Sequence, residues 1–69
     1  MNDFSQFDRM SSIEIKFALI RMAAMGPHET FQEAAHRLLE ENHPQLSLFQ
    51  YGVEMWESAL KQEFNEIEN

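Results

Sequence analysis

Apolar side chains recur every three or four residues along most of this chain, which is the spacing of amphipathic helices. The clearest case is a helix predicted over residues 44–66, where the recurring positions are Leu46, Phe49, Val53, Trp56, Leu60 and Phe64, with Ile67 just beyond. A second apolar set lies about 100° around this helix and consists of Leu48, Met55 and Ala59, with Tyr51 at its margin. We therefore expect this helix to have two neighbours.

A shorter helix is predicted over about residues 12–25. Ser11 and Glu14 have the spacing of a capping box, and Gly26 is expected to end the helix in a left-handed conformation, reinforced by Pro27. One face carries Ile13, Phe17, Ile20 and Ala24, and another carries Ile15, Leu19 and Met22. Because both faces are apolar, we expect this helix to be central.

A third helix is predicted between these two, over about residues 28–41. Either Pro27 is its first helical residue, or Thr30 caps it, because Thr30 and Glu33 also have capping-box spacing. Asn42-His43-Pro44 then separates it from the last helix, since a residue before proline disfavours the helical conformation.

The predicted fold class is all-α: one domain over residues 1–69, with three helices joined by tight turns. Residues 1–10 are expected to dock as a tail through Phe4 and Phe7. The apolar surface of the first and last helices exceeds what three short helices can cover, so we expect a homodimer through these two helices. The residues expected in the core or the dimer interface are Phe17, Leu19, Met22, Phe49, Val53, Trp56, Leu60 and Phe64.

The net charge of −7 is concentrated in the last part of the chain. Residues 1–39 contain five acids and four bases, whereas residues 40–69 contain seven acids and Lys61 alone. This charge disfavours direct nucleic-acid binding and favours a protein partner with a basic surface. The chain has no cysteine, no segment resembling a signal peptide and no apolar run of about 18 residues, so a cytoplasmic, non-membrane protein is expected.

No pattern of catalytic or metal-ligating residues stands out. His28, His36 and His43 are spaced about two helical turns apart, too far to share a tetrahedral metal site. Glu33 and His36 have the Glu-x-x-His spacing of di-metal helical bundles, but both lie on the predicted polar face. With no nucleophile motif or phosphate-binding loop, we expect neither an enzyme nor a cofactor.

The pentapeptide Gln45-Leu46-Ser47-Leu48-Phe49 resembles the short peptide by which bacterial polymerases and repair proteins bind the sliding clamp. The resemblance covers five of the 69 residues. It implies that Gln45 is a polar anchor and that Leu46, Leu48 and Phe49 fill an apolar cleft. In the helical interpretation, Leu46 and Phe49 belong to the core.

The leading functional hypothesis is a non-enzymatic protein–protein interaction module that regulates or inhibits a DNA-binding or nucleic-acid-processing partner. Phage and mobile-element regulators offer an analogy for such acidic modules. The expected partner-binding residues are Gln50, Tyr51, Glu54, Met55 and Glu57, since carboxylates along a helix can replace phosphates. Two alternatives remain open: an accessory subunit that contacts the clamp through Gln45–Phe49, and an acidic face that only maintains solubility.

Overall fold

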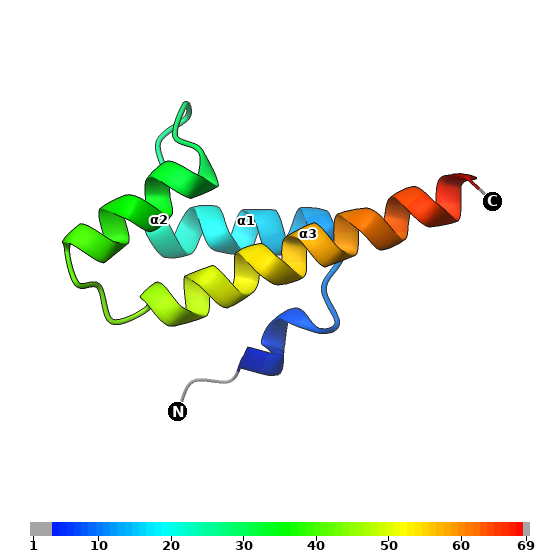
Figure 1. Ribbon diagram of the computed structural model, residues 1–69, viewed down its shortest axis with the longest axis horizontal. Helices are drawn as coiled ribbons and strands as arrows, with labels where there is room; N and C mark the ends of the chain where they lie inside the picture. The colour runs from blue at the N-terminus through cyan, green and yellow to red at the C-terminus, as the bar shows by residue number, and fades with distance from the viewer. Residues whose placement is uncertain (1–3, 69) are drawn as a thin grey trace.

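The computed structural model describes residues 4–68, with side chains described from residue 6 to residue 65, and this part of the chain contains helices and no strand (Figure 1). A short 3-10 helix, η1 (Phe4–Phe7), precedes three α-helices: α1 (Ser12–Ala23), α2 (Phe31–Glu40) and α3 (Leu46–Glu68). The predicted all-helical fold with three helices is therefore confirmed. No helix in the described part is long and apolar enough to cross a membrane.

The longest helix, α3, organises the molecule, because α1, α2 and η1 all pack against it. α1 runs antiparallel to α3, α2 lies beside the first half of α3, and η1 lies on another side of it (Figure 1). The last turns of α3 project beyond the start of α1 (Figure 1). The Cα atoms span 43 × 31 × 14 Å. Since packed helices lie 8–10 Å apart, this depth accommodates no more than about two helices.

Two capping boxes begin the shorter helices. The Ser11 hydroxyl accepts a hydrogen bond from the Glu14 backbone N–H, and the Glu14 carboxylate accepts one from the Ser11 backbone N–H. Thr30 and Glu33 make the same pair of bonds at the start of α2. Of the two alternatives for this helix, the structure therefore selects the Thr30 cap, and α2 begins at Phe31.

The end of α1 differs from the sequence-based prediction. Ala24, with φ of 49°, adopts the left-handed conformation, and the Met25 backbone N–H donates to the Ile20 carbonyl at 3.0 Å. The predicted role of Gly26 as the left-handed residue was wrong, since no described glycine has positive φ. The helix ends early because this turn brings Met25 back against the core.

The core lies where α1, α3 and η1 meet, with α2 closing one end. Its buried apolar residues are Phe7, Ile15, Leu19, Ala23, Ala34, Leu38, Leu48 and Phe49. Gly52 marks the closest approach of the elements, because a Cβ atom there would lie 2.7 Å from Leu19 Cδ2 and 3.0 Å from Phe7 Cζ. The absence of a side chain at Gly52 thus lets α1 and η1 pack on the same turn of α3.

The eight residues predicted for the core or a dimer interface fall into three groups. Leu19 and Phe49 are fully buried. Met22, Val53 and Trp56 are half-buried against the core. Phe17, Leu60 and Phe64 are exposed, so within a single chain these three do not belong to the core. On α1, the core takes the face with Ile15 and Leu19 and leaves the face with Phe17 outside.

Candidate protein-interaction surface

A groove lined by two aromatic side chains runs between α2 and α3. The rings of Phe31 and Trp56 meet edge to face, with centroids 4.8 Å apart and planes at 88°. Phe31 also makes an edge-to-face contact with the buried Phe49 at 6.4 Å. Aromatic pairs of this geometry contribute about 0.5–1.5 kcal/mol beyond the burial of area. The pair is therefore anchored to the core while both rings remain partly exposed.

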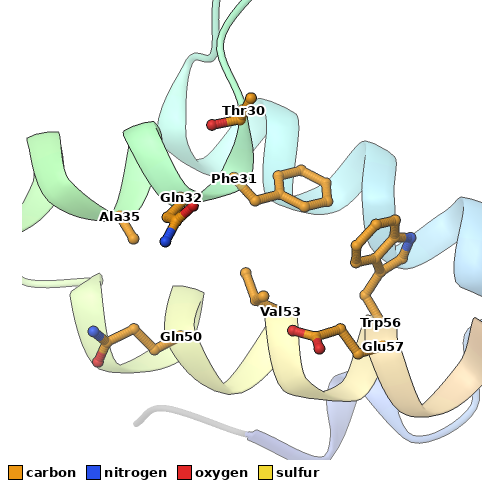
Figure 2. A pocket seen from close by; sticks show the side chains of 8 residues that line it. All are labelled: Thr30, Phe31, Gln32, Ala35, Gln50, Val53, Trp56 and Glu57. Carbon is orange, nitrogen blue, oxygen red and sulfur yellow. The ribbon is translucent and has the colours of Figure 1, made fainter.

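The main cavity of this groove has a volume of about 520 Å³. Its side chains come from α2 and its cap on one side and from α3 on the other (Figure 2). We call this cavity the α2/α3 groove; it is lined by Thr30, Phe31, Gln32, Ala35, Gln50, Val53, Trp56 and Glu57. A second cavity of about 390 Å³ shares Phe31 and Trp56 and extends towards Lys16 and Ile20 of α1. A third of about 150 Å³ reaches the exposed Leu39.

Arg37 holds the connection between α1 and α2, just before Phe31 begins α2. Its guanidinium donates to both carboxylate oxygens of Glu29 at 2.9 Å and to the Ala23 carbonyl at 2.6 Å. The hydrogen bond from Arg37 lowers the pKa of Glu29, and the same bond raises the pKa of Arg37. The bidentate geometry joins the end of α1, the connecting loop and α2 in one contact.

The exposed side of α3 next to the groove carries the acidic residues that were predicted to bind a partner. Glu57 and Gln50 lie at the edge of the α2/α3 groove, and Glu54 is exposed on the same outer side of α3. Among the described side chains, Arg37 and Glu29 form the one ion pair. The carboxylates of Glu54 and Glu57 are therefore available to a basic partner.

Tyr51 and Met55 do not belong to this surface, so the five predicted partner-binding residues do not form one site. The Tyr51 ring lies 6.3 Å from the ring of Phe7, and Met55 lines a cavity with Phe7 and Met10. Tyr51 and Met55, both expected to contact a partner, are half-buried beside the N-terminal segment. Gln50, Glu54 and Glu57 remain as candidates.

The α2 side of the groove was not predicted from the sequence. Phe31, Gln32 and Ala35 supply that side, and none of them was among the expected partner-binding residues. The number of large aromatic residues was a signal for this surface. The core of so small a domain cannot enclose Phe31, Phe49 and Trp56 together.

The pentapeptide that resembles a clamp-binding peptide is part of the folded structure. Gln45 lies in the turn before α3, and residues 46–49 form the first turn of that helix. Leu48 and Phe49 are buried in the core. Binding in an extended form would therefore require this turn to unwind and both side chains to leave the core.

Glu63 joins the last part of α3 to the start of α1. One carboxylate oxygen accepts from the Ser12 backbone N–H at 3.0 Å, and the other accepts from the Ser12 hydroxyl at 2.8 Å. The carboxylate thus satisfies an otherwise unpaired N–H group at the positive end of the α1 dipole. The backbone hydrogen bond, followed by the hydroxyl bond, lowers the pKa of Glu63.

This contact predicts a pH-dependent contribution to stability. Because the pKa of Glu63 is lower in the folded chain than its ordinary value of 4.5, its contribution is fully present above pH 4.5 and disappears as the pH falls through the folded pKa. We expect Glu63→Gln to lower the midpoint of thermal unfolding at neutral pH, with the gap from wild type closing in acid. Glu57→Gln is the control and should show little gap at either pH. A Glu63→Gln gap independent of pH would contradict this role.

The described residues contain no group of three or more His, Cys, Asp or Glu side chains placed to hold a metal ion. His28 and His36 are exposed, and His43 Nδ1 accepts a hydrogen bond from the Gln45 backbone N–H at 3.1 Å. No family model, no curated protein and no solved structure matches this chain.

Proposed function

We propose that this chain is a non-enzymatic interaction module that binds a basic segment of another protein at the α2/α3 groove and the adjacent acidic side of α3. The observation that carries the proposal is the Phe31–Trp56 pair, which lines an open groove beside exposed carboxylates. Interfaces commonly combine a central aromatic contact with a polar rim. A groove between two helices suits an amphipathic helix, whose apolar face enters the groove while its polar face meets the rim.

The charge of the module supports a nucleic-acid-binding or nucleic-acid-processing protein as the partner. Such proteins carry lysine and arginine clusters that neutralise phosphates. Glu54 and Glu57 are spaced three residues apart on one helix, and they offer such a cluster carboxylates in place of phosphates. Occupying the cluster would inhibit or regulate the partner. The net charge of −7 also accelerates encounter with a basic surface.

Self-association is part of this proposal. Large apolar side chains of α1 and α3 are left exposed within one chain, and contiguous exposed patches of this kind mark interaction sites. A second copy with the same side chains is a suitable partner for them, as in most symmetric dimers.

Affinity capture with charge-reversed variants tests the partner-binding proposal. The wild-type chain is expected to retain a basic protein from its native cells at physiological salt and to release it at high salt, where surface charges are screened. Glu54→Lys combined with Glu57→Lys should reduce retention of that protein by roughly tenfold or more. The measurement is quantitative mass spectrometry of the retained proteins.

A matched control carries the same change of charge on another part of the surface. Glu40→Lys combined with Glu41→Lys places two bases at the end of α2, where both glutamates are exposed and where bases suit the helix dipole. This variant should retain the partner as the wild type does. Equal retention by all three chains, unaffected by salt, would refute the acidic side of α3 as the binding surface.

A further inference from the structure

Four large apolar side chains remain exposed where the start of α1 meets the last part of α3. We call them the end patch: Ile13, Phe17, Leu60 and Phe64, with exposed fractions of 53, 55, 37 and 67%. Each helix contributes two of them, spaced one turn apart. The two helices are held side by side here by the hydrogen bonds from Ser12 to Glu63. The four side chains are therefore neighbours on one part of the molecule.

The two helices present these side chains to the same side of the molecule. Trp56 of α3 shares a cavity with Lys16 and Ile20 of α1, which identifies the faces that lie together. The end-patch residues of α3 follow Trp56 by one and two turns, and those of α1 precede Ile20 by seven and three residues, on the same side of its helix. The end patch thus continues the apolar surface around Trp56.

The chain has no further described element to cover this patch. α3 has 23 residues and α1 has 12, and α3 runs on past the start of α1 (Figure 1). The described N-terminal segment, which precedes α1, lies on the other flank of α3, where Phe7 contacts Tyr51. Of the large exposed apolar side chains in the described part, only Leu39 lies elsewhere.

The charges of the two helices indicate what covers the patch. α1 carries Lys16 and Arg21 against Glu14, a net charge of +1, and the Glu14 carboxylate is used in the capping box. α3 carries five glutamates against Lys61, a net charge of −4, and the carboxylate of one of them, Glu63, is used by Ser12. Placing α3 against another α3 would oppose two strongly acidic helices. Placing α1 against the α3 of a second copy instead opposes charges of opposite sign.

We infer that the end patch binds the end patch of a second copy, with α1 of each copy packed across α3 of the other about a two-fold axis. This inference rests on the self-association proposed above and adds the surface and the pairing of helices. A two-fold interface uses the same surface on both copies, so it closes as a dimer and does not extend into fibres. The patch residues are exposed in the single chain, so substituting them leaves its core intact.

Disulfide trapping between two variants tests the pairing, because the chain has no cysteine of its own. One chain carries Phe17→Cys and the other carries Phe64→Cys. In a mixed dimer of the inferred geometry, one contact becomes a pair of cysteines and the symmetry-related contact keeps both phenylalanines. Mixing the two chains under mild oxidation should therefore give the mixed disulfide at least tenfold faster than either chain forms a disulfide with itself.

Sedimentation equilibrium of the wild-type chain accompanies this measurement. A mass of twice 8.2 kDa at micromolar concentration is expected, with Phe17→Asp weakening the dimer at least tenfold and Leu39→Asp, at the other exposed apolar position, leaving it unchanged. A dimer in which Phe64→Cys pairs fastest with itself would overturn the inferred pairing but leave self-association standing. A monomer at every concentration would overturn both, without bearing on the α2/α3 groove.

Discussion

Phe49→Ala is expected to lower the free energy of unfolding by about 3–5 kcal/mol, the cost of removing a fully buried phenylalanine from a core. Phe49 is completely buried and contacts Phe31 edge to face, so the cavity would lie beneath the α2/α3 groove. Small domains are stable by only about 5–15 kcal/mol, with the smallest at the lower end. Most of the folded state's margin should therefore be lost.

Urea denaturation followed by circular dichroism measures this change, at one protein concentration because association makes stability depend on concentration. Leu39→Ala is the control, since Leu39 is 59% exposed and surface substitutions usually change stability by less than about 0.5 kcal/mol. If Phe49→Ala were as stable as this control, Phe49 would not be a core residue. In that case a peptide of residues 44–50, which needs no folded core, would test whether the pentapeptide binds the clamp.

Phe7→Ala is expected to cost about 3 kcal/mol, at the lower end of the range for buried phenylalanines. Phe7 is 1% exposed although it lies in a short N-terminal segment, and it fills the space that Gly52 leaves on α3. Its loss should loosen the segment over Tyr51 and Met55 as well as lower the stability of the whole chain.

The measurement is again urea denaturation, combined with hydrogen exchange of the α3 amides near Gly52, which should become less protected. Gln6→Ala is the matched control, because Gln6 is the exposed neighbour in the same segment. If Phe7→Ala matched Gln6→Ala in both measurements, η1 would not be docked. Tyr51 and Met55 would then regain their place as candidate partner contacts.

The helices could be predicted from the sequence because their signals are local. The apolar spacing of α3, the Ser11–Glu14 box and the Thr30–Glu33 box each depend on residues within a few positions of one another. The end of α1 could not be predicted, because Gly26 offered a more favourable left-handed residue than Ala24. The contact of Met25 with the core determines where α1 ends, and that contact depends on tertiary structure.

The candidate site was predicted only in part, for the same reason. Glu54 and Glu57 are recognisable as acids on the polar face of one helix. Which apolar face of a helix is buried depends on which neighbour reaches it. Ile15 and Phe17 are two residues apart with similar hydrophobicity, yet one is buried and the other is 55% exposed. No local pattern in the sequence shows which of the two apolar faces of α1 is buried.

Partner binding at the α2/α3 groove can be followed through Trp56, the only tryptophan in the chain. Chain labelled with 5-fluorotryptophan gives one fluorine resonance, from a ring in contact with Phe31 in the groove. When a partner recovered by affinity capture is titrated in, this resonance should shift or exchange with the same affinity as binding measured by sedimentation. A resonance unchanged at saturating partner would contradict the groove as the binding site.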